Sequence, residues 1–214
     1  MSKKIETRNP ILNKKDLTKS VIEKSNVIYL DKVIIDEGVF DNENIEEVKI
    51  GESILENVSF LSSEIDEIKI TDSLIGHINF AGTTFNQSYF ERIIISNSRF
   101  QGTQFLGGCF IRDVAIKKSK CTDMTLRFSK MENAIFVDCD LENADFLGAD
   151  LKNINFKNCN LKNSQFSQAK LKNINFKESK IDGICLEKDS FENITVNTGQ
   201  ALYLASDLGL NIED

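Results

Sequence analysis

The sequence is poor in several residue types that most globular enzymes use. Among its 214 residues there are one proline, one histidine and no tryptophan. No apolar run approaches the roughly 20 residues of a membrane-spanning helix, and the opening Met-Ser-Lys-Lys lacks the apolar stretch of a signal peptide. The five cysteines are odd in number and contain no close C-x-x-C pair, which favours a reducing compartment over a disulfide framework. We therefore expect a cytoplasmic protein without a membrane segment.

Motifs of catalysis and of cofactor binding are also missing. The sequence contains no G-x-x-x-x-G-K-[ST], no H-E-x-x-H and no G-x-S-x-G. The single histidine, His77, follows Gly76 and has no neighbouring cysteine or carboxylate, so a surface corner is favoured over a metal or catalytic site. We expect a protein that is not an enzyme, with no catalytic residue, no cofactor and no metal.

The charge balance is acidic. There are 33 Asp and Glu residues against 26 Lys and Arg, for a net charge of −7. Binding to nucleic acid depends largely on cationic contacts to phosphates. Direct nucleic-acid binding is therefore disfavoured, and a basic protein partner is favoured.

What the sequence does contain is a repeat. Large apolar residues fall at every fifth position from Leu30 to Phe110, and after a slip of one residue again from Ile116 to Val196. Fourteen of the fifteen phenylalanines lie on this grid, and Phe128 is the exception. A period of five matches neither a helix nor a flat strand. The slip between Phe110 and Ile116, just after Gly107-Gly108, indicates a bulge or kink in the middle of the repeat.

The residues between the large ones indicate how the chain coils. Two positions before each large residue stands a compact one, such as Ala134 or Ala144, and two positions after it asparagine is frequent, which suits a corner. The heptapeptide Leu-Lys-Asn-Ile-Asn-Phe-Lys occurs at 151–157 and again at 171–177, so four pentapeptides are expected to form one coil. Cys139 and Cys159 should then stack on adjacent coils, where buried thiols are favoured over the disulfide that the spacing would allow.

This pattern resembles the pentapeptide-repeat family, whose consensus Ala-(Asp/Asn)-Leu-X-X is matched by Ala144-Asp145-Phe146 and Ala149-Asp150-Leu151. The resemblance covers residues 26–198 and implies an all-β solenoid, a right-handed quadrilateral β-helix. Its length would be about 40 Å at the ~4.8 Å spacing of paired strands. Residues 1–25 keep the period poorly, and we expect them to form an N-terminal cap over the open edge of the first coil.

The C-terminal residues 199–214 have a helical period and are expected to form a capping and dimerisation helix. Ala201, Leu204, Ala205 and Leu208 follow the i, i+3, i+4, i+7 rule, with Thr198 as N-cap and Gly209 as the stop. Leu202, Tyr203 and Leu210 add apolar surface beyond what one capping stripe needs.

This tail resembles the terminal segment of Qnr-type and mycobacterial fluoroquinolone-resistance pentapeptide proteins. The matching residues are Gln200, Ala201, Leu204, Ala205, Leu208, Gly209 and Leu210. The resemblance implies a homodimer of two rods joined tail to tail that imitates B-form DNA and binds DNA gyrase or topoisomerase IV. The residues expected at the dimer contact are Leu202, Tyr203, Leu204, Leu208 and Leu210.

The acidic residues are concentrated near the N-terminus. Residues 31–72 hold thirteen carboxylates and three lysines, and a coil of twenty residues would place Glu46 beside Asp66 and Glu47 beside Glu67. Like charges in register destabilise a sheet, so their retention suggests a use, although a solvated surface is the alternative. The expected partner-binding surface comprises Asp41, Glu43, Glu46, Glu47, Glu64, Asp66 and Glu67.

Two functional hypotheses follow. The first is a non-enzymatic DNA mimic that binds a bacterial type II topoisomerase and either modulates it or protects it from quinolones. Residues 152–177 weigh against it, because they carry six lysines and no carboxylate. The alternative is a pentapeptide-repeat scaffold with a regulatory role that binds another protein partner.

Overall fold

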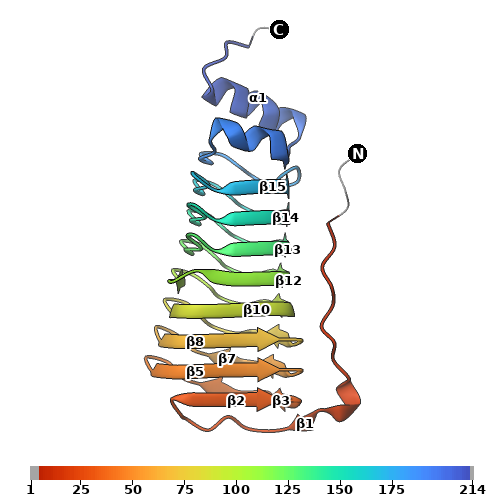
Figure 1. Cartoon of the computed structure of the whole chain (residues 1–214), viewed down its shortest axis with the longest axis vertical. Coiled ribbons are helices and arrows are strands. Elements are labelled where there is room, and N and C mark those ends of the chain that lie inside the picture. The colour runs from red at the N-terminus through yellow and green to blue at the C-terminus, as the bar shows by residue number, and fades with distance from the viewer. Residues whose placement is uncertain (1–4, 213–214) are drawn as a thin grey trace.

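A computed structural model, which describes residues 5–212, shows a parallel β-solenoid of about eight turns that ends in one short helix. The strands stack as rungs along a rod, with the C-terminal helix α1 at one end (Figure 1). The predicted fold class is therefore confirmed. Each paired strand in the described part lies parallel to its neighbour, in line with a chain that keeps winding in one direction.

In each coil one strand pairs with the equivalent strands of the neighbouring coils, and these strands together form the main ladder of the sheet. These strands are β2 (Val27–Asp31), β5 (Asn44–Gly51), β8 (Glu64–Thr71), β10 (Thr84–Ser96), β12 (Cys109–Lys117), β13 (Lys130–Val137), β14 (Asp150–Lys157), β15 (Lys170–Asn175) and β16 (Ile194–Thr195). Shorter strands form the other sides, namely β1 (Thr18–Lys19), β3 (Val33–Ile35), β4 (Gly38–Val39), β6 (Ile54–Glu56), β7 (Val58–Ser59), β9 (Leu74–Gly76) and β11 (Gln104–Phe105). Two 3-10 turns, η1 (Lys14–Asp16) and η2 (Lys188–Asn193), precede β1 and β16, and α1 spans Thr198–Asp207.

The core is the stacked column of large residues on the five-residue grid. Phe136, Phe156 and Phe176 are fully buried, and their rings stack at centroid distances of 5.2 and 5.4 Å. The compact residues two positions earlier, such as Ala134 and Ala144, are buried beside them. Two inward residues per pentapeptide thus fill the rod, as the repeat predicts.

The corners explain the frequent asparagines. Asn133, Asn143, Asn153, Asn163 and Asn173 all adopt positive φ angles of 54 to 58°. Asparagine tolerates this left-handed conformation better than most residues, because its short amide bonds to nearby backbone. Several of these amides also bond from coil to coil, for example Asn153 Nδ2 to Asn133 Oδ1 at 2.8 Å.

The one-residue slip lies at Gly107-Gly108, and the prediction that it lies between Phe110 and Ile116 is wrong. Strand pairing aligns Tyr89 with Phe110, so Phe110 points outward and Ile111 takes the inward position. The extra residue is accommodated at a corner where both glycines have positive φ, 70 and 85°. A Cβ on Gly107 would lie 2.5 Å from the backbone oxygen of Asn86, so that position accepts only glycine without rearrangement.

The backbone conformation at this corner differs between the N-terminal and C-terminal coils of the rod. In the N-terminal coils this corner position is held by Glu47, Glu67 or Gln87, which lie within strands and have no positive φ. In the C-terminal coils it is held by Phe128, Gly148 or Gln168, which adopt the left-handed conformation. The inserted residue marks the coil at which this change occurs.

The N-terminal residues do more than cover the first coil. β1 pairs with β3, and Ile22 packs against the core at that end of the rod. Residues 5–13 instead run along the side of the rod (Figure 1). Arg8 Nε donates to Asp113 Oδ2 at 2.8 Å, and Ile11 N donates to Asp72 Oδ1 at 2.9 Å. We call residues 5–13 the N-terminal strap.

Candidate functional site: an acidic face, a mid-rod groove and an apolar tail

One side of the solenoid is defined by two columns of outward side chains. Strand pairs and bridges align Asn44, Glu64, Thr84, Gln104, Thr125, Asp145, Gln165 and Cys185. Two residues further along each coil lie Glu46, Asp66, Asn86, Leu106, Arg127, Leu147, Ser167 and Glu187. We call this side, with the corner residue that follows it in each coil, the acidic face.

The acidic face carries seven carboxylates and two bases, Arg127 and the corner residue Lys188. The carboxylates are Glu46, Glu47, Glu64, Asp66, Glu67, Asp145 and Glu187. Arg127 already donates from Nε to Asp145 Oδ2 at 2.6 Å. The two columns contain no lysine. Negative charge is therefore concentrated on the two coils that hold Glu46, Glu47, Glu64, Asp66 and Glu67.

The structure places the seven predicted partner-binding residues in two groups. Glu46, Glu47, Glu64, Asp66 and Glu67 lie together on two adjacent coils, with Glu47 and Glu67 in direct register. Asp41 belongs to the preceding side of the coil, where its carboxylate accepts from Leu61 N at 2.9 Å. Glu43 lies at the corner between these sides and pairs with Lys24 at 2.7 Å.

Local contacts organise this acidic group. Asn86 Nδ2 donates to Asp66 Oδ1 at 2.7 Å and lies 3.3 Å from Glu64 Oε1, so one amide holds two carboxylates near each other. Hydrogen bonds from Lys49 and then from the Tyr29 hydroxyl lower the pKa of Glu47 below its usual value. Glu47 therefore stays ionised at neutral pH. A hollow of about 320 Å³ lies among Asn44, Glu46, Glu64 and Asp66.

The lysine-rich C-terminal coils do not interrupt the acidic face. Lys130, Asp150 and Lys170 share one column of the β13–β14–β15 ladder, and Lys152 and Lys172 share another. Both columns belong to the adjacent side of the rod. Charge is thus sorted by side as well as by position along the chain, which a count along the sequence does not reveal.

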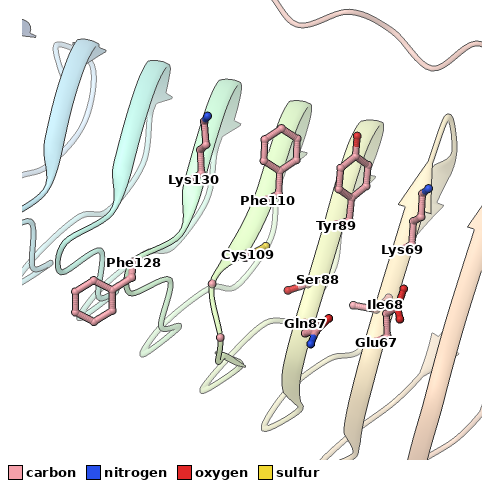
Figure 2. Close-up of a pocket in the computed structure, with 12 residues that line it drawn as sticks. Glu67, Ile68, Lys69, Gln87, Ser88, Tyr89, Cys109, Phe110, Phe128 and Lys130 are labelled. Carbon is pink, nitrogen blue, oxygen red and sulfur yellow. The ribbon is translucent and has the colours of Figure 1, made fainter.

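A groove of about 520 Å³ opens on the adjacent side where the slip interrupts the sheet. Figure 2 shows Lys69, Tyr89, Phe110 and Lys130 in a row across successive strands. The Tyr89 and Phe110 rings stack at 5.1 Å, and Lys69 Nζ lies 5.4 Å from the centre of the Tyr89 ring. The sequence analysis missed this row because it placed Phe110 inside the rod.

The C-terminal helix is capped differently from the prediction. Asn197, not Thr198, is the N-cap, and its side chain and that of Gln200 form a reciprocal capping box. Gln200 is buried and its amide donates to Phe176 O at 2.8 Å, which covers the last coil. Ala201 and Leu208, expected to face inward, are exposed instead.

The five residues predicted for dimerisation therefore divide into two sets. Leu204 is 6% exposed and Tyr203 packs partly on the core, with its hydroxyl accepting from Gly183 N at 2.8 Å, so both serve the cap of their own chain. Leu202 and Leu210 are 50% and 61% exposed, and Leu208 is also exposed. Ile212 joins them as an exposed apolar residue that the sequence analysis did not select. We call Leu202, Leu208, Leu210 and Ile212 the apolar tail patch. The side chain of Phe191, which the repeat places in the last coil, lies outside the described residues.

His77 and the cysteines occupy structural positions. His77 is an exposed corner residue with a φ of 50°, and its Nδ1 lies 3.0 Å from Glu56 Oε2. Cys139 and Cys159 stand in an inward column that also holds Ser98, Ser119 and Ser179, and each Sγ contacts backbone oxygens as the serine hydroxyls do. All five thiols are free, and burial raises the pKa of Cys109 to about 12.

Among residues 5–212, no three metal-ligating side chains come together. Over the same range no helix is both long enough and apolar enough to cross a bilayer.

Comparison with known proteins finds a family model that matches part of the repeat. Residues 109–186 match the family model for a pentapeptide repeat region, whereas a search of curated protein sequences finds no match. The solved structure of HetL, a pentapeptide repeat protein involved in heterocyst differentiation regulation from Nostoc sp. strain PCC 7120, is 13% identical, with 75% of this chain and 85% of HetL covered and a TM-score of 0.34.

Two further solved structures are similar at the same low level of identity. A trypsin-treated form of QnrB1, a plasmid-mediated fluoroquinolone resistance protein, is 14% identical, with 92% of this chain and 96% of that chain covered and a TM-score of 0.37. Rfr23, a pentapeptide repeat protein from Cyanothece 51142, is 16% identical over 62% of this chain and 88% of its own, with a TM-score of 0.19. The twenty-residue coil, seen in the pairing of β13 with β14, runs through residues 109–186, the part of the chain that matches the pentapeptide repeat model.

Proposed function

We propose that this protein is a non-catalytic DNA mimic of the cytoplasm that binds a bacterial type II topoisomerase, either DNA gyrase or topoisomerase IV. The observation that carries the proposal is the cluster of five carboxylates, Glu46, Glu47, Glu64, Asp66 and Glu67, on two adjacent coils of the acidic face, where the face holds no basic residue. The resemblance of the tail to the Qnr-type and mycobacterial resistance proteins supports the choice of partner.

Charge density supports mimicry over part of the rod. Duplex DNA carries one negative charge per ~1.7 Å of axis. Glu46, Glu47, Glu64, Asp66 and Glu67 fall on two coils, which span about 10 Å at the spacing of paired strands. Five carboxylates over that length give one negative charge per ~2 Å, about five-sixths of the density of duplex DNA. A protein surface that binds DNA phosphates could therefore bind this cluster.

Geometry supports a dimer as the binding form. A single rod of about eight coils measures about 40 Å, and two joined at the apolar tail patch would measure about 80 Å, the length of ~24 base pairs at 3.4 Å each. Such a dimer would carry an acidic end at each extremity.

The test is a supercoiling assay with purified gyrase, a decatenation assay with topoisomerase IV, and both repeated with a quinolone. We compare the wild-type protein with a variant in which Glu46, Glu47, Asp66 and Glu67 are replaced by lysine. A matched control replaces Asp36, Glu37, Glu52 and Glu56 by lysine; these residues lie at the same end of the rod but on other sides.

We expect the wild-type protein to change the activity or quinolone sensitivity of at least one enzyme. The acidic-face variant should lose this effect, and the control should keep it, because the two variants have the same net charge. Equal loss in both variants would show that the effect depends on the overall charge of the protein and not on the acidic face. No effect of the wild-type protein on either enzyme would favour the scaffold alternative.

A further inference from the structure

Phe128 breaks the residue rule of the corners. Its backbone has a φ of 55°, a conformation that is a genuine outlier for a bulky side chain. Every other residue with positive φ in the described part is glycine or carries a polar side chain. The ring is 66% exposed, so burial does not offset the cost of this conformation. Backbone strain that packing does not explain points to a functional constraint.

The neighbouring coil is built to hold the ring on the surface. Gly148 occupies the same corner one coil later, and a Cβ there would lie 2.5 Å from the Phe128 ring. The ring therefore packs directly on a glycine, whose lack of a side chain leaves space for it. Leu106 and Leu147, one coil to either side on the acidic face, are exposed and half-buried, respectively.

Phe128 is among the residues that line the groove of about 520 Å³, but its ring is largely exposed. In Figure 2 its ring lies away from the row of Lys69, Tyr89, Phe110 and Lys130. A convex aromatic ring flanked by two leucines suits insertion into a pocket on another protein, where aromatic anchors supply much of the binding energy. It offers no enclosure for a small molecule.

The clustered carboxylates lie on the same side of the rod as this ring, and the two coils between them carry no charged residue on that side. Phe128 lies in the same corner column as Glu47 and Glu67, and three coils separate it from Glu67, about 15 Å at the spacing of paired strands. One partner surface of ordinary size covers both, since standard interfaces bury about 800 Å² on each side. A partner that matches both features has an apolar pocket next to a basic surface.

We infer that Phe128, flanked by Leu106 and Leu147, is the apolar anchor of the topoisomerase contact, and that the carboxylates of the acidic face align the partner around it. This inference rests on the proposed function and adds to it the residue that DNA mimicry by charge does not explain. Phosphate imitation requires only carboxylates, whereas the ring would supply contact that duplex DNA cannot offer.

The test replaces Phe128 by asparagine, the residue most frequent at the other corners. Phe128→Asn relieves the strained backbone, so the melting temperature should stay the same or rise. Binding to immobilised purified gyrase and topoisomerase IV should weaken by about tenfold or more if the ring is an anchor. The matched control is Leu61→Asn, which removes an exposed apolar residue from another side of the same rod.

Each outcome separates the two proposals. Weaker binding of Phe128→Asn at an unchanged or raised melting temperature, with Leu61→Asn like the wild type, supports the anchor. Unchanged binding of Phe128→Asn by a wild type that does bind overturns the anchor and leaves the proposed function standing. A clear fall in the melting temperature of Phe128→Asn would show that the ring stabilises its own chain and would also overturn the anchor. Absence of wild-type binding to both enzymes would overturn the proposed function and the anchor together.

Discussion

Single residues in this solenoid contribute very differently to its stability, depending on whether their side chains point into the rod or outward. Phe156 is fully buried between the stacked rings of Phe136 and Phe176, and it meets Phe146 and Phe166 edge to face at 6.2 and 6.3 Å. Lys157, the next residue, is exposed. One step along the chain therefore separates the centre of the core from solvent.

We expect Phe156→Ala to lower the free energy of unfolding by about 3–5 kcal/mol, because it removes ring contacts on four sides and leaves a cavity. Lys157→Ala should change it by less than about 0.5 kcal/mol. Chemical denaturation of both variants measures the two effects. Similar losses in the two variants would contradict the stacked-ring core.

At the scale of elements, the N-terminal strap is tied to the rod by charge. Asp113 is 1% exposed and accepts from Arg8, and Asp72 accepts a bidentate pair of hydrogen bonds from Arg92, both at 2.7 Å, as well as the bond from Ile11 N. Asp72, Arg92 and Asp113 fall on consecutive coils at one corner. The strap thus crosses several coils along a line of alternating charge.

The strap predicts a dependence of stability on pH. Burial alone would raise the pKa of Asp72, but hydrogen bonds from Arg92 and Ile11 N and the positive charges of Arg92 and Arg8 hold it below its usual value. A carboxyl whose pKa is lowered in the folded state contributes stability above its unfolded pKa of about 3.9 and loses that contribution as pH falls through the lower value.

Asp72→Asn should therefore melt at a lower temperature than the wild type at pH 7, and the difference should shrink as pH is lowered below about 4. Thermal melts across this range, with hydrogen exchange at the Ile11 amide, measure both effects. The exposed Asp36→Asn is the control. A difference between Asp72→Asn and the wild type that stays constant with pH would contradict the role of the charge.

At the scale of the whole molecule, the two ends of the rod are finished differently. Residues 18–22 cover the first coil through β1 and Ile22, whereas α1 covers the last coil with Gln200 and Leu204. The second cap leaves the four residues of the apolar tail patch in solvent, whereas the first leaves Val21 exposed. A second copy can cover such a patch, and two-fold closure would stop growth at two.

We expect light scattering to report about twice 24.2 kDa for the wild-type protein. Replacing Leu202 and Leu210 by aspartate should give folded monomers, because both side chains are exposed and neither belongs to the cap. Leu61→Asp is the control for adding charge at an exposed leucine elsewhere. A wild-type monomer at micromolar concentration would contradict the dimer, and a monomeric variant with full topoisomerase activity would separate dimerisation from function.

The sequence by itself determined the coil. A period of five with two inward residues per repeat leaves one way to bury the phenylalanines, and the period of twenty sets which residues stack. Those are local rules, repeated many times, so they survive single exceptions such as the placement of Phe110. The helix at the C-terminus followed in the same way, although the N-cap shifted by one residue because Asn197 and Gln200 form a reciprocal pair.

Only the tertiary structure decided which corner accommodates the extra residue, how the N-terminal strap runs and on which side of the rod the carboxylates cluster. Gly107 takes the extra residue because no Cβ fits beside the Asn86 oxygen, a contact between coils that sequence spacing does not show. The Arg8–Asp113 pair joins residues 105 positions apart. The separation of carboxylates from lysines, and the exposure of Phe128 over Gly148, arise because winding brings distant residues into shared columns, and a column is a property of the coil rather than of the chain.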